Sequence, residues 1–490
     1  MNLWAGGNVL WFVTVAAVVT IDVIALIVVP RGRKPTAAMA WLLLILALPF
    51  VGIVLYALIG SVKLPEKRRQ EQSHINGVIR RRAAASGLEV DRSPWPAWFD
   101  QVTRQNEALT SLPPVEGNRL TLIGDYGGSI AAMTAAVETA TRFVHVEFFI
   151  VSYDTTTKAL FEAMAGAVRR GVTVRLLADQ FSSRRVAGSK ETFAELDRIG
   201  VRWAWMLPST PLRGPYLRPD LRNHRKLVVV DGQVAFVGSQ NLIDRTYNSP
   251  KNLARGLKWQ ELVARVEGPI VAEVDAVFFS DWLIETGEDL EAEHVAASDL
   301  VLHGSRDTVV CQIVPSGPSF DTEPNLRLFL ALINGATERV ILTSPYFVPD
   351  EPMIYAITSA CHRGLDVQLF VSEIGDQGLV FHAQRSYYAP LLEAGVRIFR
   401  YPAPFILHAK HCSIDDDVAF IGSSNMDIRS FSLNSEISML VRGTSFVRDM
   451  RAVEEAYRQA SRELTLAEWK REPAKATFLD GLARLTSALN

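Results

Sequence analysis

The sequence predicts an α/β fold made of two similar halves, preceded by two transmembrane helices. Three observations lead to this prediction. The chain has 490 residues, which is enough for two or three domains. Its amino-terminal region holds two long apolar runs. A polar motif in Asn223–Asn241 returns in Leu407–Asn425, and the segments that precede the motif return with it.

Two apolar segments, Val9–Val29 and Ala37–Ile59, predict a membrane anchor in residues 1–62. A bilayer crossing needs about 20 apolar residues, and each segment meets that length. The basic loop PRGRKP joins the two segments, and Asp22 is the one charged residue inside either of them. Two helices buried in a soluble core are the alternative interpretation.

The charges beside these segments bear on the side of the membrane that the rest of the chain occupies. Basic residues are more numerous between Lys63 and Arg82 than in the loop, so the positive-inside rule favours a cytoplasmic position for the larger part. Residues 63–110 are expected to be a juxtamembrane linker that binds anionic headgroups or forms a solvated helix. The three cysteines, few and odd in number, fit a reducing compartment.

Helices alternate with apolar strands in the first domain, which we place at residues 111–297. Alternation of this kind indicates an α/β layer fold. The expected helices are Ser129–Thr141, Thr157–Arg170 and one that ends with Phe193–Ile199, and the expected strands are Phe143–Val151, Val172–Ala178 and Val201–Met206.

The second domain, placed at residues 298–490, repeats this order. RGVTVRLLAD (Arg170–Asp179) corresponds to RGLDVQLFVS (Arg363–Ser372), and IGVRWAWM (Ile199–Met206) corresponds to AGVRIFRY (Ala394–Tyr401). The acidic segment Glu285–His303 is the expected linker between the halves. A repeat of whole domains suggests duplication, and two such halves would pack about a pseudo-twofold axis with the active site between them.

The repeated motif reads His, one residue, Lys, four residues, Asp, six residues, Gly-Ser, one residue and Asn. In the first copy, Asp231 and Gly232 lie between apolar runs and predict a β-hairpin with a two-residue turn. His224 then faces Ser239, and strand alternation puts Lys226 and Asn241 on the same face.

The second copy gives the same arrangement, with its turn at Asp415 and Asp416. His408 then faces Ser423, and Lys410 and Asn425 share their side of the sheet. The motif aspartates, Asp231 and Asp415, sit in the turns and away from the histidines. We therefore expect them to serve the catalytic motifs in a structural role.

This polar face has the groups that phosphodiester chemistry needs. A neutral imidazole can attack phosphorus, and a second, protonated imidazole can donate a proton to the leaving oxygen. Two lysines and the Ser and Asn donors can hold the non-bridging oxygens. One hairpin supplies one histidine, so the two copies must meet. A metal site at His408 and His411 is a weak alternative, because no Cys or carboxylate lies at ligand spacing.

The two copies resemble the paired HxKxxxxD motifs of the phospholipase D superfamily, with the GSxN that follows them. The resemblance implies two phospholipase D-like α/β/α sandwich domains, a phosphohistidine intermediate, and no metal or other cofactor. It implies that His224 is the nucleophile and His408 the acid. It further implies an acidic residue that orients each histidine, for which the candidates are Glu261 and Glu436; Glu261 lies farther from its motif than Glu436 does.

The amino-terminal stretch RKPTAAMAWLLLILALPFVGIVLYALIG resembles the paired-helix anchor of bacterial cardiolipin synthases. The resemblance implies a cell-membrane enzyme that joins two molecules of phosphatidylglycerol into cardiolipin and releases glycerol. A phospholipase D-type hydrolase, a phosphatidyltransferase with another acceptor alcohol, and an inactive membrane scaffold remain alternatives.

The remaining predictions concern partners. The formal charge of −2 gives no case for nucleic acid as a partner. The expected partners are phosphatidylglycerol, cardiolipin and the membrane, and the sequence leaves open whether the chain forms a homo-oligomer. Arg213, Arg218 and Arg222 precede His224, and Arg222 faces Asn241 in the predicted hairpin. We consider two interpretations of Arg222: it binds a headgroup phosphate, or it is an ordinary surface charge.

Overall fold

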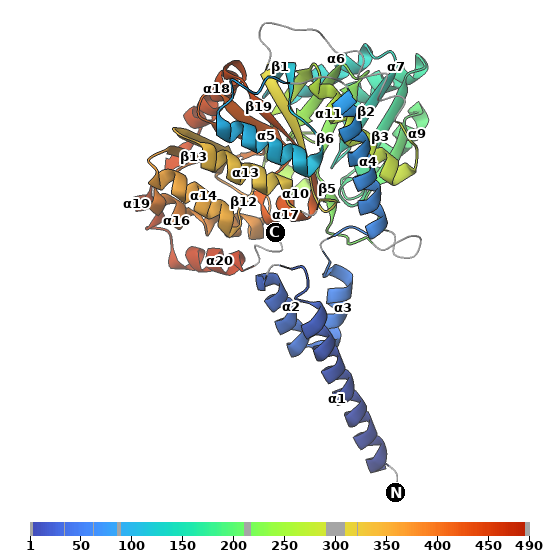
Figure 1. Cartoon of the computed structure of the whole chain (residues 1–490), viewed down its shortest axis with the longest axis vertical. Helices are drawn as coiled ribbons and strands as arrows, with labels where there is room; N and C mark the ends of the chain where they lie inside the picture. Colours follow the sequence, from blue (N-terminus) through green and yellow to red (C-terminus); the bar gives the residue numbers. More distant parts are fainter. Residues whose placement is uncertain are drawn as a thin grey trace. The chain divides into compact units, whose positions relative to one another are not determined.

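The computed structural model describes residues 3–33, 35–61, 63–85, 90–209, 217–290, 309–320 and 322–485. These residues form two compact units, Met1–Leu64 and Pro65–Asn490. Figure 1 shows the helices and strands of both units with the labels used below.

The first unit consists of α1 (Leu3–Val28), α2 (Pro35–Ala47) and α3 (Pro49–Ile59). Among the described residues, Trp11–Val28 in α1 is the one stretch long and apolar enough to cross a membrane. The second predicted crossing does not form a continuous helix. Leu48 leaves the helical region, with φ −139° and ψ 72°, because the proline that follows it disfavours that conformation.

The two short helices pack against each other after this break. Gly52 lies against the backbone of Ile45, and the rings of Trp41 and Tyr56 meet edge to face at 5.4 Å. Neither α2 nor α3 has the length of a crossing. The described part of the first unit therefore holds one apolar helix of crossing length and two shorter ones, in place of the two crossings predicted.

The second unit is built on one mixed sheet of 16 strands among the described residues. From one edge inward, the first half contributes β4 (Arg202–Met206), β3 (Thr173–Asp179), β2 (Phe143–Phe148), β6 (Lys226–Val230), β7 (Val234–Gly238), β9 (Val263–Glu267) and β1 (Val115–Ile123). From the other edge, the second half contributes β20 (Arg462–Leu464), β14 (Arg397–Tyr401), β13 (Asp366–Ser372), β11 (Arg339–Thr343), β16 (His411–Ile414), β17 (Val418–Gly422), β19 (Asn434–Arg442) and β10 (Val309–Ser316).

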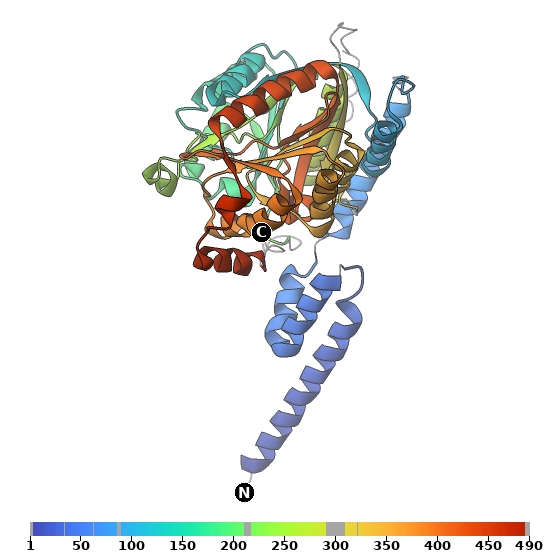
Figure 2. The same ribbon diagram turned by 90° about the vertical axis from the view of Figure 1, so that its left-hand side faces the viewer.

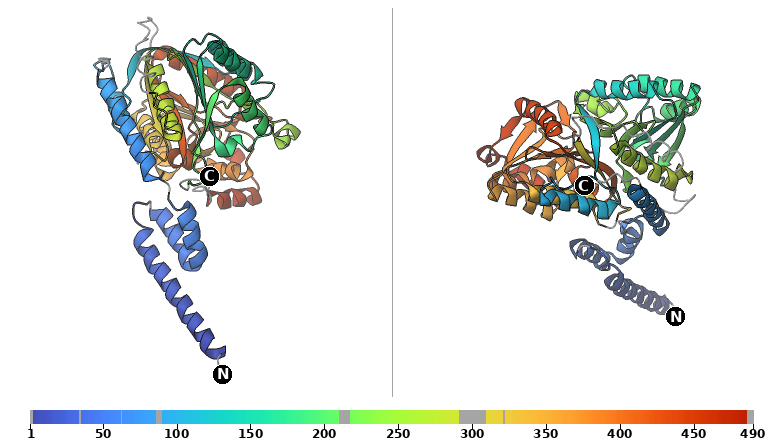
Figure 3. Two further views of the ribbon diagram at one scale, coloured as in Figure 1. Left: turned by 90° about the vertical axis from the view of Figure 1, so that its right-hand side faces the viewer. Right: turned by 45° about the horizontal axis from the view of Figure 1, so that its top comes forward.

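The halves meet where β1 and β10 pair antiparallel. Apart from β20, the order of strands outward from β1 matches the order outward from β10. Figure 3 shows the two halves side by side, one in cyan and green and the other in orange and red. The predicted α/β class with two repeated halves is confirmed.

Helices cover both faces of this sheet. On one face, α11 (Ile270–Thr286) and α18 (Thr444–Ala460) lie over a core that both halves share, and Figure 2 shows α18 running across it. On the other face, the first half is covered by α6 (Tyr126–Glu138), α7 (Lys158–Arg169) and α9 (Ser189–Ile199), and the second by α5 (Ala97–Thr110), α13 (Pro324–Gly335) and α14 (Glu351–His362). Because α11 reaches β10 and α18 reaches β1, each half helps to cover the other.

The elements predicted for the first half are confirmed in kind and order. The three predicted strands are β2, β3 and β4, and the three predicted helices are α6, α7 and α9. Gly200 ends α9 in the left-handed conformation, at φ 79°, which glycine adopts without a steric penalty.

The segment predicted to be a linker packs on the second unit. Helix α4 (Glu66–Ala85) is held by Arg68, whose guanidinium donates two hydrogen bonds of 2.6 and 2.8 Å to the carboxylate of Glu285. Phe99 of α5 is fully buried in the core of the second half. Another segment, Glu285–His303, was also predicted to be a linker, and its residues 291–303 lie outside the described residues.

Short elements complete the second unit. They are α8 (Gln180–Ser183), β5 (Arg222–Asn223), α10 (Pro250–Ala254), β8 (Lys258–Gln260), β12 (Phe347–Val348), α15 (Gly378–Arg385), α16 (Tyr388–Ala394), β15 (Phe405–Leu407), β18 (Met426–Asp427), α17 (Ile428–Ser432), α19 (Leu466–Trp469) and α20 (Ala474–Arg484).

The predicted register of both motif hairpins is wrong by one residue. Val230 pairs with Val234 and Ile414 with Val418, so each turn has three residues and not two. Asp231 and Gly232 do reach positive φ, at 54° and 69°, but Gln233 belongs to the turn as well. Facing residues therefore shift by one, and strict alternation would turn Ser239 away from His224. Ser239 nevertheless lies at the site, because β7 ends at Gly238 and the alternation of the strand no longer applies to Ser239.

Candidate active site

Each motif histidine follows a short strand that pairs with the other half. His224 follows β5, which runs parallel to β19, and its backbone N–H donates to the carbonyl of Ser435 at 2.8 Å. His408 follows β15, which runs parallel to β8, and its N–H donates to the carbonyl of Gln260 at 2.7 Å. The chain that leads into each histidine is thus positioned by the opposite half.

Each histidine is also paired with a glutamate of the opposite half. Nδ1 of His224 lies 3.0 Å from both carboxylate oxygens of Glu436. Nδ1 of His408 lies 2.8 and 2.9 Å from those of Glu261. The structure therefore brings both candidate orienting residues to the histidines, and each half completes the site of the other. The greater distance in sequence between Asn241 and Glu261 is accounted for by α10, which lies between them.

The serines of the two motifs hold these glutamates in equivalent ways. Ser423 donates to Glu436 at 2.5 Å, and its hydroxyl accepts from the N–H of Ile437 at 3.0 Å. Ser239 accepts from the N–H of Leu262 at 3.0 Å, and its hydrogen bond to Glu261 partly opposes the rise that burial causes in the pKa of that carboxyl. Both serines thus act on the glutamate of their own half.

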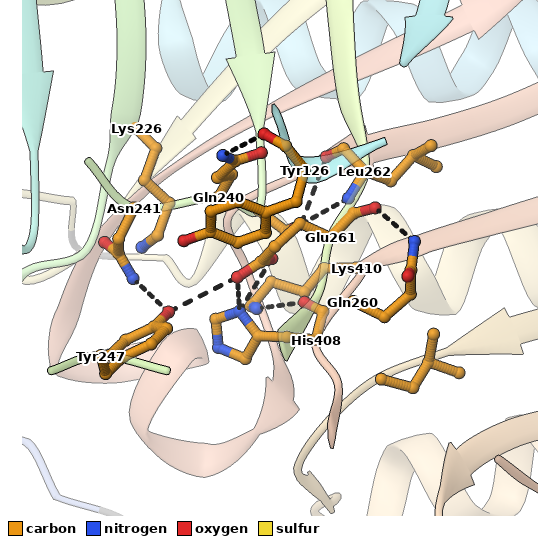
Figure 4. A network of polar contacts seen from close by, with 12 residues as sticks. Tyr126, Lys226, Gln240, Asn241, Tyr247, Gln260, Glu261, Leu262, His408 and Lys410 are labelled. Atoms are coloured by element: carbon orange, nitrogen blue, oxygen red, sulfur yellow. Dashed lines mark hydrogen bonds and ion pairs between the residues drawn. The ribbon is translucent and has the colours of Figure 1, made fainter. Parts of the chain in front are cut away.

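The two lysines lie fully inside the site. Nζ of Lys226 donates to the carbonyl of His224 at 2.6 Å, and Nζ of Lys410 donates to that of His408 at the same distance. Burial lowers the pKa of Lys226 to about 7 and that of Lys410 to about 8, although the glutamates oppose this shift. Figure 4 shows both lysines with the pair formed by His408 and Glu261.

The two histidines are buried and are influenced by the charges of both lysines. Burial lowers the pKa of His224 well below its usual value, and the charges of Lys226 and Lys410 lower it further. Burial likewise lowers the pKa of His408, with added contributions from both lysines and from His224. The basic groups of the two halves therefore act on each other electrostatically, and each disfavours the charged form of the histidines.

This arrangement fixes the proton on each neutral imidazole. A carboxylate accepts hydrogen bonds, so Nδ1 carries the hydrogen and Nε2 keeps its lone pair. Burial raises the pKa of Glu261 and of Glu436 to about 7, and the lysines oppose that rise. Each imidazole is then oriented with a nucleophilic or proton-accepting Nε2, as the chemistry predicted from the motifs needs.

The motif aspartates bind backbone and not the histidines. The carboxylate of Asp231 accepts hydrogen bonds from the N–H groups of Thr141, Arg142 and Phe143 and from the hydroxyl of Thr141. Asp415 accepts the equivalent bonds from the segment Thr337–Arg339. Each carboxylate ties the hairpin turn to the start of the neighbouring strand.

The asparagines and Arg222 differ between the halves. Asn241 donates to the hydroxyl of Tyr247 at 2.8 Å, while the N–H of Asn425 bonds to Ser430. Arg222 is buried and donates to Asp179 at 3.1 Å, so its interpretation as ordinary surface charge is wrong. Arg213 lies outside the described residues.

Aromatic residues that the motif analysis did not single out surround the histidines. The ring of Phe149 meets that of His224 at 4.8 Å, and Tyr247 and Tyr346 lie 6.4 and 6.2 Å from His408. The Tyr346 hydroxyl lies 3.1 Å from both carboxylate oxygens of Asp376. Phe149 directly follows β2, and Tyr346 lies three residues after β11. Loops at the ends of strands often carry functional groups, but this position alone does not mark a particular residue.

Within the ranges that the structure describes, no group of three or more His, Cys, Asp or Glu side chains could hold a metal ion. His411 lies 3.6 Å from Glu454, in a buried cluster under α18. His408 instead faces Glu261, so the two histidines of H-x-x-H do not act together.

Comparison with known proteins bears on this site. The family described as "Cardiolipin synthase, PLD-like domain" matches residues 134–282 and 329–456, and so covers more than half of the chain and both motifs. The chain belongs to this family. A further family, "Phospholipase_D-nuclease N-terminal", matches residues 20–61 in the first unit.

Similar proteins cover the chain almost from end to end. Cardiolipin synthase of Geobacillus kaustophilus is 30% identical and aligns with 99% of this chain and 95% of its own length. Cardiolipin synthase A of Serratia proteamaculans is 31% identical, with 92% of each chain covered. A solved structure of phosphatidylserine synthase from Haemophilus influenzae has a TM-score of 0.60 at 13% identity and covers 80% of this chain and 100% of its own. That last likeness shows the fold alone.

Proposed function

We propose that this chain is a cardiolipin synthase that transfers the phosphatidyl group of one phosphatidylglycerol to another, giving cardiolipin and glycerol. The observation that supports this best is the cross-half pairing of His224 with Glu436 and of His408 with Glu261 in a chain of this family. The pairing supplies two oriented imidazoles in one pocket, which is the number that a two-step transfer requires.

In the first step, Nε2 of His224 attacks the phosphorus of a phosphatidylglycerol. A P–N bond forms, the bond from phosphorus to the headgroup oxygen breaks, and protonated His408 gives its proton to that oxygen, so glycerol leaves. The negative phosphate of the substrate favours the charged form of His408, against the burial that lowers its pKa. Glu436 stabilises the positive charge that develops on His224.

In the second step, His408 takes the proton from a hydroxyl of a second phosphatidylglycerol. The hydroxyl oxygen attacks phosphorus, the P–N bond breaks, and His224 returns to its starting state. Glu261 stabilises the positive charge on His408. Lys226 and Lys410 would bind the non-bridging oxygens, with Asn241, Asn425 and Arg222 as further candidates for phosphate contacts and Ser239 and Ser423 as supports for the glutamates.

The domain organisation supports the same proposal. We assign residues 111–297 and 298–490 to two phospholipase D-like α/β/α sandwich domains about a pseudo-twofold axis. The matching strand order and the equivalent contacts of the two motifs support this assignment. The proposed reaction uses no metal and no other cofactor, and its substrates are lipids, not nucleic acid.

The first unit would hold the enzyme in the cell membrane through α1. The sequence prediction adds a second crossing at about 37–59 and a cytoplasmic second unit, whereas the break at Leu48 favours α2 and α3 entering and leaving on one side. Thiol labelling of single cysteines in the loop 30–35 and at residue 66 separates the two topologies. Two crossings predict labelling from opposite sides, and one crossing predicts labelling from the same side.

The test of the proposed activity is incubation of the purified full chain with phosphatidylglycerol labelled in its acyl chains. We expect labelled cardiolipin and free glycerol from the wild type and neither from His224→Ala. Phosphatidic acid as the main product would show a hydrolase, and a product that forms only on addition of another alcohol would show a different acceptor. A His224→Ala variant that sustains the full biological effect in cells would show a scaffold.

A further inference from the structure

Exposed apolar side chains gather on one region of the second unit. Among the residues from Pro65 onward whose exposure the structure describes, seven large apolar side chains are exposed. One, Tyr355, lies on α14. The other six lie on three helices or directly after them, and they are Leu253 on α10, Leu379 on α15, and Phe478, Leu479, Leu482 and Leu485 on α20 or at its end.

Helix α20 shows that this exposure follows a face of the helix. Asp480 and Ala483 are buried, and Nδ1 of His382 on α15 lies 2.7 Å from the Asp480 carboxylate. Phe478, Leu482 and Leu485 recur at helical spacing on the other side, where Phe478 is 70% exposed and Leu485 80%. The helix is thus firmly attached by its polar side and leaves its apolar side uncovered, at the periphery of the second unit (Figures 1 and 2).

Two of the three helices, α10 and α15, adjoin the segment Ile374–Gln377, and α20 packs against α15. Arg255, which follows α10, donates to the carbonyl of Gly375 at 2.8 Å. Helix α15 begins directly after Gln377 and packs along α20. Ile374–Gln377 lines a small cavity together with Tyr346, whose ring lies 6.2 Å from His408. The uncovered apolar surface therefore adjoins a segment that contacts the neighbourhood of Tyr346 and His408.

The charges exposed beside this surface are basic. Lys251, Arg255 and Lys258 are exposed on α10 and just after it. On α20, Lys475 and Arg484 are exposed, whereas Asp480 is buried and paired. Basic residues that flank an apolar helical face are typical of helices that lie in the interface of a bilayer with anionic lipids. A large exposed apolar patch marks an interaction site in a folded protein.

We infer that α10, the start of α15 and α20 form a surface that inserts into the interface of a bilayer containing anionic phospholipid. Phe478, Leu482 and Leu379 enter among the acyl chains, and the basic residues meet the headgroups. A lipid bound there has its phosphate next to the segment Ile374–Gln377, from which it reaches His408 without leaving the interface. This inference rests on the proposed function for the identity of the lipid.

The test places a fluorophore whose emission reports water exposure at residue 482, by Leu482→Cys in a Cys361→Ser background. The full chain is reconstituted in vesicles of phosphatidylcholine with or without phosphatidylglycerol. We expect a blue-shifted emission at residue 482 that quenchers attached to lipid tails reduce, and a stronger effect with phosphatidylglycerol. The matched control is Tyr355→Cys on α14, which should report water in both kinds of vesicle.

A second pair of variants links the surface to turnover. Phe478→Glu with Leu482→Glu should lower the rate of cardiolipin formation in vesicles about tenfold, because two carboxylates must then enter the interface. The same variant should keep its rate in detergent micelles, which also shows that it folds, and Tyr355→Glu should keep its rate in both.

The outcomes separate the inference from the proposed activity. Emission at residue 482 that matches residue 355 would overturn the inference, as would a blue shift that depends on protein concentration and not on lipid, since that indicates a second copy of the chain. Lipid-dependent quenching at residue 482 in a protein that makes no cardiolipin would support the surface and refute the proposed activity.

Discussion

Replacement of Glu436 by Gln tests whether this residue, from the second half, orients His224 in the first. The carboxylate accepts from Nδ1 of His224 at 3.0 Å and from Ser423 at 2.5 Å. A hydrogen bond to a charged group contributes about 1.5–3 kcal/mol, which corresponds to roughly 10- to 150-fold in rate. The amide can also donate to Nδ1 and so select the wrong tautomer, and the equivalent change in a serine protease triad costs about 10⁴-fold. We therefore expect phosphatidyl-histidine formation to slow by about 10²- to 10⁴-fold.

The assay is single-turnover formation of the labelled adduct, followed by rapid quenching at alkaline pH. The matched variant is Glu261→Gln, whose target is His408. A phosphatidyl ester of p-nitrophenol has a leaving group that needs no proton, so it should restore adduct formation in Glu261→Gln and not in Glu436→Gln. Wild-type rates in Glu436→Gln, or equal rescue of both variants by the activated ester, would refute the cross-half assignment.

Three further predictions follow from the same contacts. Because burial lowers the pKa of Lys226 to about 7 and that of Lys410 to about 8, both lose their protons as pH rises, and kcat/KM should fall above that range in a pH profile; a flat alkaline limb would contradict this. Asp231→Ala should lower the free energy of unfolding by roughly 3 kcal/mol in denaturant titrations while the folded fraction keeps its single-turnover rate, since the carboxylate accepts hydrogen bonds from the backbone and from the Thr141 hydroxyl; a stable but inactive variant would give Asp231 a direct catalytic role. Tyr247→Phe should lower kcat about tenfold with KM unchanged, because its hydroxyl connects Asn241 to Glu261, and an unchanged kcat would exclude that role.

The sequence allowed us to predict which residues carry the chemistry, but not how those residues are arranged in space. The spacing repeated around His224 and His408 identified both motifs, because each residue type in it has a separate duty in the hairpin or the pocket. The exchange of Glu261 and Glu436 between the halves could not be predicted, because it depends on how β8 and β19 meet the partner strands β15 and β5. No local pattern encodes a pairing between segments so far apart in the chain.

The differences between the predictions and the structure have local physical causes. The predicted hairpin register is wrong because Gln233 joins Asp231 and Gly232 in the turn. Positive φ at Asp231 and Gly232 does not by itself determine whether the turn has two residues or three. The second crossing stays a prediction, and its segment is divided into α2 and α3 because composition records hydropathy and not the effect of Pro49 on Leu48. Tyr247 and Tyr346 were not singled out, since a tyrosine in a loop has no spacing that marks it.

The central claim is that imidazoles from two halves act on a single phosphorus atom. The most direct measurement is to quench the full chain during turnover of phosphatidylglycerol labelled at phosphorus and to locate the label by peptide mapping. The account predicts an alkali-stable label on His224, absent from His224→Ala and accumulating in His408→Ala with the activated ester. Steady cardiolipin formation with no labelled histidine, or with the label on His408 alone, would contradict it.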